Sequence, residues 1–313
     1  MNDRQSVTAE RGVVRTEMGS LDALIHVPDC PGPLPGIVLV DGSGDGTADG
    51  WGDLPFHLAS MGVIVLTHDK PGCGESPGHW SKQSFHDRAA ESLSAIAVLR
   101  ARRDVGPNVG LYGVSQGGWV AVLAANIMPD EVAFIVSVSG PGVSPAKQER
   151  ARIERQLRSD GYAEETIGEA MAWIDERTRR LVGGEEANLV LETQNSLTDK
   201  VWYTLATEYF DSTEMLGFLA RILAFDPVPY LEGIQCPVFA AFGAADDLIP
   251  VGESAAIFAK HLATLPGYPH ALAVFPHADH GLFVAPAREG IERSQQLASG
   301  FLTMVRQLVD EHR

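Results

Sequence analysis

The chain of 313 residues is long enough for one large α/β domain with an inserted subdomain, and its hydrophobic content of 45% is sufficient for a core. A formal net charge of -17 argues against nucleic acid and against anionic membranes as partners, because both would repel an acidic surface. The three cysteines form neither a metal pattern nor a disulfide framework, and the polar N-terminus has no apolar signal segment, so we expect a cytoplasmic protein.

Short apolar runs alternate with helical patterns through most of the chain. Residues 13–27 alternate in polarity, which predicts a pair of antiparallel edge strands. Buried parallel strands are predicted at 36–40, 63–67, 109–112, 133–138, 238–242 and 271–275, with helices at 85–102 and 116–126. The alternation predicts an α/β fold with a doubly wound, mostly parallel sheet, whose ligands bind beyond the carboxyl ends of the strands.

A glycine-rich loop, Asp-Gly-Ser-Gly at 41–44, follows the first predicted parallel strand. It begins like an EF-hand calcium loop, but Gly52 stands at the twelfth position, where that site requires a bidentate glutamate. The loop also lacks the Gly-Lys-Ser/Thr ending of a phosphate-binding loop and the context of a dinucleotide fingerprint. We therefore expect neither a metal nor an organic cofactor.

Residues 111–118, Leu-Tyr-Gly-Val-Ser-Gln-Gly-Gly, contain a G-x-S-x-G pattern between a predicted strand and a predicted helix. A serine on such a sharp turn adopts strained backbone angles that lift its hydroxyl, here that of Ser115, clear of the sheet. Gly113 and Gly117 must be bare, because a Cβ at either would collide with the neighbouring strand or helix. The N–H groups that open the helix point to the place where an oxyanion would form. By itself the pattern is also compatible with an ordinary glycine-rich turn.

The composition changes after Gly142, where the sequence becomes helical and charged up to about residue 225. Ser144-Pro145 is a typical helix start, and helices are predicted at 145–158, 163–181 and 196–225. A plain crossover between the flanking strands needs far fewer residues. We therefore divide the chain into a core (1–142), a helical cap (143–225) and a second part of the core (226–313).

Aromatic side chains in the predicted cap have two interpretations. They either pack the cap against the core or line an apolar pocket for an acyl or alcohol group. The residues that we assign to the substrate pocket are Gly44 of the glycine-rich loop and Trp202, Tyr203 and Phe210 of the cap.

Two acidic residues and two histidines compete for a role beside the serine. Asp246 and Asp247 follow the strand predicted at 238–242, and His277 and His280 follow the strand at 271–275. A serine hydroxyl is a weak nucleophile at neutral pH, so it needs a histidine to accept its proton and an aspartate to orient the imidazole. Side chains that follow these strands can meet the serine at one edge of the sheet.

These motifs resemble those of the α/β-hydrolase superfamily, and most of all its bacterial serine esterase and acyl-peptidase-like branch. The order Ser, Asp, His carries the resemblance, together with the loop at 41–44 and the turn His-Asp-Lys-Pro-Gly-Cys-Gly-Glu-Ser at 68–76. The resemblance implies Asp246 over Asp247, because the family places two variable residues between glycine and the aspartate. It implies His280 over His277, because His280 precedes Gly281.

Two positions depart from the pattern of that superfamily. Asp41 stands where the family usually has histidine, and Pro71 replaces the usual arginine, so a common loop-anchoring cation is missing. The resemblance implies that the backbone N–H groups of Gln116 and Ser43 form the oxyanion hole, with Gly44 as the alternative donor. Both departures affect the expected shape of that hole.

The motifs together predict a serine hydrolase that cleaves a carboxylic ester, a thioester or an activated amide of a small acyl substrate. Ser115 would carry the acyl group, His280 would act as base and Asp246 would orient it. Peptidases, lactonases, C–C bond hydrolases and acyltransferases use the same triad and stay open as alternatives. A non-catalytic ligand-binding protein of this fold is the remaining interpretation. The oligomeric state stays open, with a homodimer among the options.

Overall fold

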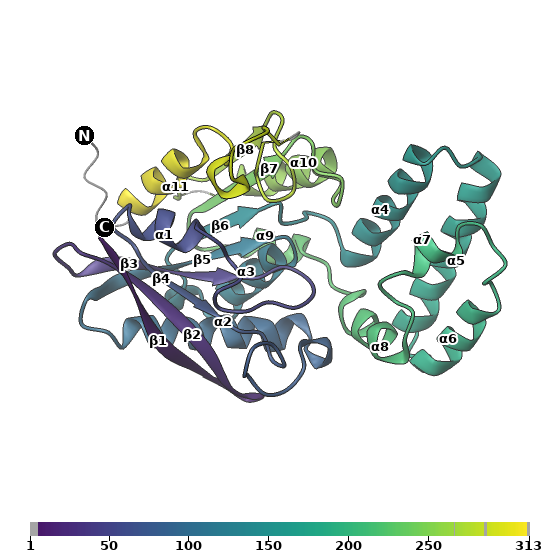
Figure 1. Ribbon diagram of the computed structural model, residues 1–313, viewed down its shortest axis with the longest axis horizontal. Helices are drawn as coiled ribbons and strands as arrows, with labels where there is room; N and C mark the ends of the chain where they lie inside the picture. The colour runs from purple at the N-terminus through teal and green to yellow at the C-terminus, as the bar shows by residue number, and fades with distance from the viewer. Residues whose placement is uncertain (1–5, 266, 285–286, 312–313) are drawn as a thin grey trace.

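The computed structural model describes residues 6–265, 267–284 and 287–311. Its centre is an eight-stranded sheet with the order β1-β2-β4-β3-β5-β6-β7-β8 (Figure 1). β1 pairs antiparallel with β2, β2 pairs antiparallel with β4, and the other neighbours pair in parallel. The strands are Val7–Thr16 (β1), Gly19–Pro28 (β2), Leu34–Val40 (β3), Ile64–His68 (β4), Val105–Val114 (β5), Ile135–Val138 (β6), Val238–Gly243 (β7) and Ala271–Phe275 (β8).

Helices cover both faces of this sheet, which explains why its inner strands are continuous apolar runs. Every residue of β3, β4, β6 and β7 is buried, as expected for parallel strands between two helical layers. The predicted α/β fold with a mostly parallel sheet is therefore confirmed. The helices of the layers are Leu54–Ala59 (α1), Phe85–Arg100 (α2), Gln116–Ile127 (α3), Val228–Glu232 (α9), Val251–Leu262 (α10) and Phe301–Asp310 (α11).

Two clusters of buried apolar side chains hold the layers together. One contains residues of α2, α3 and α10, and the other contains residues of α1 and α11 on the opposite face. Short 3₁₀ turns lie at Trp80–Lys82 (η1), Pro129–Glu131 (η2) and Arg293–Gln295 (η3). Among the residues that the structure describes, no helix is long and apolar enough to cross a membrane.

The edge pair is longer than the sequence predicts. β1 and β2 are paired from Val7 opposite Pro28 to Thr16 opposite Gly19, whereas the alternating pattern indicates only residues 13–27. The first half of β1 is mostly exposed and contains charged residues, so its apolar alternation is weak. Backbone pairing with β2 extends the strand regardless of this pattern.

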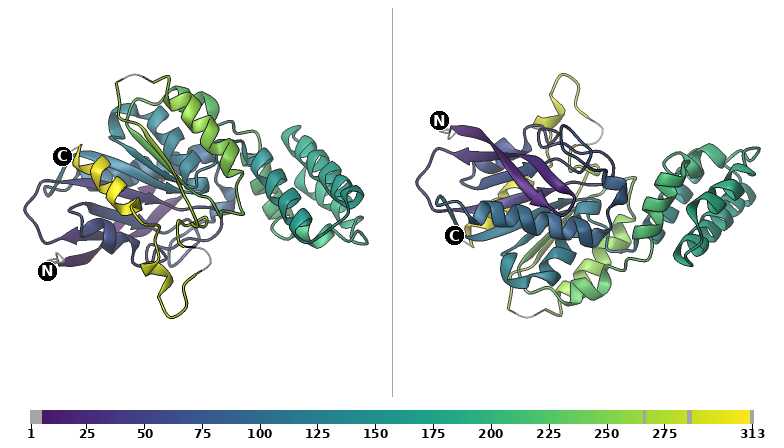
Figure 2. Two further views of the ribbon diagram at one scale, coloured as in Figure 1. Left: turned by 90° about the horizontal axis from the view of Figure 1, so that it is seen from above. Right: turned by 90° about the horizontal axis from the view of Figure 1, so that it is seen from below.

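A group of helices, here called the α4–α8 unit, lies between β6 and β7 in the chain and beside one end of the sheet (Figures 1 and 2). Its helices are Pro145–Ser159 (α4), Glu164–Val182 (α5), Ala187–Asn195 (α6), Tyr203–Thr207 (α7) and Thr213–Ile222 (α8). The helix predicted at 196–225 is thus two helices, because Ser212 caps a new start by accepting from the N–H of Met215. α6 has no counterpart among the sequence predictions.

Polar contacts connect α4 to the loop after β7. Arg155 donates to the carbonyl oxygens of Asp247 (2.7 Å) and Ile249 (3.1 Å), and Gln148 donates to that of Leu248 (2.7 Å). The first helix of the α4–α8 unit is therefore hydrogen-bonded to the loop that contains Asp246.

Candidate active site

Ser115 occupies a strained turn between β5 and α3. Its backbone angles are φ 55 and ψ -122, a combination that non-glycine residues rarely adopt. A Cβ on Gly113 would lie 2.1 Å from the carbonyl oxygen of Gly117, and one on Gly117 would lie 2.1 Å from that of Val40. Both positions therefore require glycine for the steric reason that the sequence predicts.

The structure pairs Asp246 with His280 at the ends of β7 and β8. His280 Nδ1 lies 2.7 Å from Asp246 Oδ2, and the aspartate side chain is fully buried. Asp246 Oδ1 accepts from the backbone N–H groups of Leu248 (2.8 Å) and Ile249 (3.3 Å). Three hydrogen bonds thus fix this carboxylate, which in turn fixes the orientation of the imidazole.

The two competing residues, Asp247 and His277, take no part in this pair. Asp247 is exposed, and its carbonyl oxygen rather than its carboxylate accepts a hydrogen bond from Arg155. His277 is also exposed. The Ser115 hydroxyl forms no hydrogen bond within the described part of the chain, so its contact with His280 stays a prediction.

The residues that carry the two proposed oxyanion donors line the same cavity as Ser115. These residues are Ser43 and Gln116, and Gly44 lines the cavity too. Gln116 opens α3, where the first N–H groups of a helix have no partner inside it. The N–H of Ser43 has no hydrogen-bond partner among the residues that are described.

The loop at 41–46 is anchored by cations that sequence reasoning missed. The substitution of Pro71 for arginine suggests a missing anchor, but Lys70 and Arg88 both donate to carbonyl oxygens of this loop. Arg88 lies 47 positions from Asp41 in the chain, so no local pattern indicates the contact. Asp41 itself turns into the loop, where its Oδ1 accepts from the N–H of Gly42 at 2.8 Å.

The cavity at Ser115 has a volume of about 540 Å³, which is in the range of small-molecule sites. Ser43, Gly44, Ser115 and Gln116 line it together with residues of the α4–α8 unit. Neither Asp246 nor His280 is among its lining residues. Apolar side chains dominate the lining: Trp80, Trp119, Phe210, Met215, Phe218, Leu219, Ile222 and Leu248.

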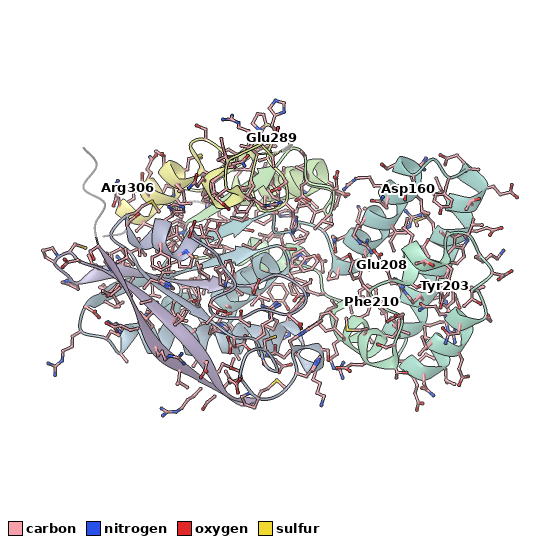
Figure 3. All side chains as sticks on the ribbon, in the orientation of Figure 1. Asp160, Tyr203, Glu208, Phe210, Glu289 and Arg306 are labelled. Carbon is pink, nitrogen blue, oxygen red and sulfur yellow. The ribbon has the colours of Figure 1, made fainter. Side chains whose placement is uncertain are left out.

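Of the aromatic residues assigned to the pocket from sequence, Phe210 lines this cavity, whereas Trp202 and Tyr203 do not. Trp202 is 2% exposed and packs inside the α4–α8 unit, with its indole N–H 3.4 Å from Glu169. The Tyr203 hydroxyl donates to Asn195 at 3.0 Å. Figure 3 shows Tyr203 within the α4–α8 unit. The assignment of Trp202 and Tyr203 is thus corrected, because both serve contacts within the helical unit.

One end of the cavity is polar. Arg152 Nε donates to Glu149 at 3.2 Å, and the guanidinium stacks over Tyr209 with its carbon 5.0 Å from the ring centre. The buried Arg177 pairs with the same Glu149 at 3.4 Å. Because Arg152 is already paired, this end offers little free positive charge.

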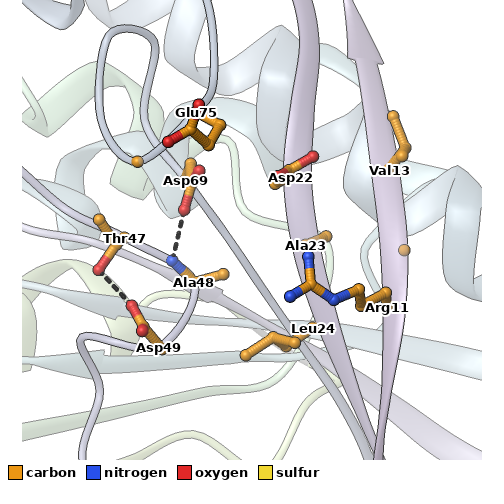
Figure 4. Close-up of a pocket in the computed structure, with 12 residues that line it drawn as sticks. Arg11, Val13, Asp22, Ala23, Leu24, Thr47, Ala48, Asp49, Asp69 and Glu75 are labelled. Carbon is orange, nitrogen blue, oxygen red and sulfur yellow. Dashed lines mark hydrogen bonds between the residues drawn. The ribbon is translucent and has the colours of Figure 1, made fainter.

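A second cavity of about 600 Å³ lies against β1 and β2 (Figure 4). Carboxylates of Asp22, Asp49, Asp69 and Glu75 line it, but Asp69 is used structurally and accepts from the N–H of Ala48 at 2.8 Å. None of the residues predicted for catalysis lines this cavity. The cavity at Ser115 is therefore the candidate active site.

The alpha/beta hydrolase family model matches residues 37–291 of the chain. A 2-hydroxy-6-oxononadienedioate/2-hydroxy-6-oxononatrienedioate hydrolase of Dechloromonas aromatica is 25% identical over 76% of this chain and 80% of that enzyme. The Pseudomonas putida enzyme of the same name is 33% identical over 42% of this chain and 46% of that enzyme. Esterase EstD of Thermotoga maritima is 29% identical over 48% of this chain and 38% of that esterase.

Solved structures agree on the fold. An esterase of Pyrococcus furiosus, PF2001, aligns with a TM-score of 0.60 at 14% identity over 98% of this chain and 91% of that one. The family match covers most of the chain, and the relatives named above are hydrolases. The chain therefore belongs to the alpha/beta hydrolase family.

Proposed function

We propose that the protein is a serine hydrolase that cleaves carboxylic esters of small molecules through an acyl-enzyme on Ser115. The observation that carries this proposal is the strained position of Ser115 at a cavity that Ser43 and Gln116 also line. The Asp246–His280 pair supports it, because a histidine held by a buried carboxylate is the base that such a serine needs. A cytoplasmic location belongs to the same proposal, as does the role of the α4–α8 unit as a cap over the substrate.

In the proposed reaction, Ser115 Oγ attacks the ester carbonyl while its proton passes to His280 Nε2. Asp246 holds Nδ1 and stabilises the imidazolium, and the N–H groups of Gln116 and Ser43 bind the oxyanion. The tetrahedral intermediate collapses to an acyl-serine as the leaving alcohol takes the proton from His280. Water then attacks the acyl-serine, His280 again relays the proton, and the carboxylic acid leaves the restored serine.

The lining of the cavity favours a neutral ester with an apolar or aromatic group. Its wall on the α4–α8 unit is apolar over most of its extent. Arg152 is the one cation among the described lining residues, whereas Asp45 and Glu149 contribute carboxylates. A strongly anionic substrate would meet repulsion in such a site.

Hydrolysis of a C–C bond is a second candidate. It is favoured by the relative from Dechloromonas aromatica, whose match extends over 80% of its length. The substrate in the name of that enzyme is a dioate, which carries two carboxylates. A dioate would need Arg152 to exchange Glu149 for a substrate carboxylate, so this candidate requires a rearrangement at the polar end of the cavity.

The test compares the wild-type protein with Ser115→Ala on p-nitrophenyl esters of increasing acyl length and on a 2-hydroxy-6-oxo dienedioate. Loss of the nucleophile should lower kcat for esters by at least on the order of a thousandfold. Ester hydrolysis by Ser115→Ala at the wild-type rate would reject the proposal. Turnover of the dioate alone, abolished in Ser115→Ala, would favour the second candidate.

A further inference from the structure

Two buried cations bind the backbone of the loop at 41–46. Lys70 follows β4, is 2% exposed, and donates from its ammonium group to the carbonyl oxygens of Gly42 and Gly44. Arg88 lies on α2, is 3% exposed, and donates to the carbonyl oxygens of Asp41 (2.8 Å) and Gly42 (3.3 Å). Three carbonyl groups of one short loop are thus held from two different elements.

Arg88 also reaches the start of α3. Its Nη1 lies 2.6 Å from Gln116 Oε1 and 3.3 Å from the carbonyl oxygen of Gly42. The backbone N–H of Gln116 is one proposed oxyanion donor. The other is the N–H of Ser43, which belongs to the same peptide group as the carbonyl of Gly42. A single guanidinium therefore connects the two halves of the proposed oxyanion hole.

Peptide geometry determines where the donor on Ser43 points. In a trans peptide, the carbonyl group of one residue and the N–H of the next point in opposite directions. Since the carbonyl of Gly42 is directed at Lys70 and Arg88, the N–H of Ser43 points away from both cations. The N–H of Gly42 is already bonded to Asp41 at 2.8 Å, whereas the N–H of Ser43 has no partner among the described residues, and Ser43 lines the same cavity as Ser115.

We propose that Arg88 and Lys70 are positioning residues that hold the N–H groups of Ser43 and Gln116 as one preorganised pair of oxyanion donors. Neither cation is among the residues that line the cavity, so Lys70 acts through the loop, and Arg88 acts through the loop and the Gln116 side chain, and not on the substrate. This inference rests on the proposed function, because it concerns the oxyanion of the ester reaction. Preorganised donors are worth most where charge develops in the transition state.

Lys70 can hold the loop whether or not its side chain is protonated. Burial, assisted by the neighbouring Arg88, lowers the pKa of Lys70 to about 7, while Asp41 and Glu91 oppose this shift. A neutral amine still carries two N–H donors, which match the two carbonyl groups that Lys70 binds. The hydrogen bonds to the loop are therefore retained on either side of neutral pH.

The test measures ester hydrolysis by Arg88→Met and Lys70→Met, with kcat and KM separated. Active enzyme is counted by end-point labelling with a fluorophosphonate. Each variant should lose about 10- to 100-fold in kcat per active site, less than the loss on removing an oxyanion donor itself, with KM changed less than about threefold. Arg100→Met is the matched control, because Arg100 lies on the same helix and also donates to two backbone carbonyl oxygens, those of Asp130 and Glu131. It should retain kcat.

Gln116→Met is a milder variant. It keeps the backbone N–H and removes only the side-chain amide, whose oxygen accepts the hydrogen bond from Arg88. It should reproduce part of the loss in Arg88→Met, and the double variant should lose much less than the product of the two single effects. This variant tests the connection even where Arg88→Met does not fold.

Normal kcat per active site in Arg88→Met, Lys70→Met and Gln116→Met, with only a lower melting temperature, would overturn the positioning role. Ser115→Ala separates this outcome from failure of the proposed function. Retained activity in Ser115→Ala rejects the serine mechanism itself. An inactive Ser115→Ala beside normal kcat in the other variants rejects only the role of Arg88 and Lys70.

Discussion

The cavity at Ser115 has two sides of different origin. The sheet side consists of the loop at 41–46 and the start of α3, where Ser115 adopts strained backbone angles. The hydrogen-bonded Asp246–His280 pair follows β7 and β8 of the same sheet. The helical side comes from the α4–α8 unit, where side chains such as Phe218 and Leu219 are placed by packing among helices. Under the proposed function, the reaction would depend on backbone geometry, and the choice of substrate would depend on side chains of the α4–α8 unit.

The largest expected effect lies on the sheet side. Asp246→Asn should lower kcat for esters by about 10⁴-fold, because an amide holds the imidazole in the wrong tautomer. Asp247→Asn is the matched control, since Asp247 is the adjacent but exposed aspartate, and it should stay within about twofold of the wild type. Steady-state kinetics of both variants check this. Equal losses in the two would remove Asp246 from its proposed role.

The buried Lys70 should make the stability of the fold depend on pH. Its pKa is lowered to about 7 by burial and by Arg88, against the opposing influence of Asp41, Cys73 and Glu91. In the unfolded chain it titrates near its ordinary value of about 10.4, so between these values the unfolded state binds more protons. Stability due to this group therefore rises with pH across that window.

Urea unfolding measures this effect as the difference between the wild type and Lys70→Met. The free energy of unfolding of the wild type should gain about 2–3 kcal/mol relative to the variant between pH 7 and pH 9, at about 1.4 kcal/mol per unit. Parallel stability curves for the two proteins would contradict a lowered pKa in the folded state.

Substitutions on the helical side should lower activity less than those on the sheet side, and only for some esters. Phe210→Ala should lower kcat/KM for bulky esters by about 10-fold and for acetate esters much less, because Phe210 lines the cavity. Tyr203→Ala is the control, since Tyr203 is a half-buried aromatic of the same unit that does not line it. Kinetics over an acyl-length series distinguish the two. A uniform loss over all esters in Phe210→Ala would place this residue outside substrate selection.

The sequence predicts features of the sheet side whose causes are local. The requirement for glycine at 113 and 117 follows from a few neighbouring atoms, and the structure reproduces it. The mostly parallel sheet follows from apolar runs that are buried on both faces. Such features depend on the backbone of short segments, which composition and spacing reveal.

Other features depend on residues far apart in the chain. Arg88 anchors the loop at 41–46 from a position 47 residues away from Asp41. The proline at position 71, taken alone, therefore wrongly suggests that the loop has no cationic anchor. Trp202 and Tyr203 are aromatic, as pocket residues often are, yet their polar groups bond within the helical unit, to Glu169 of α5 and Asn195 of α6. Tertiary contacts of this kind leave no local signal.

In the proposed mechanism, Ser115 is a nucleophile that His280 activates. The most direct measurement is reaction with a fluorophosphonate followed by peptide mass spectrometry to locate the adduct. We expect an adduct on Ser115 that is absent in Ser115→Ala, forms far more slowly in His280→Ala and forms at the normal rate in His277→Ala. An adduct on a different residue, or ester hydrolysis that persists while Ser115 stays unlabelled, would contradict it.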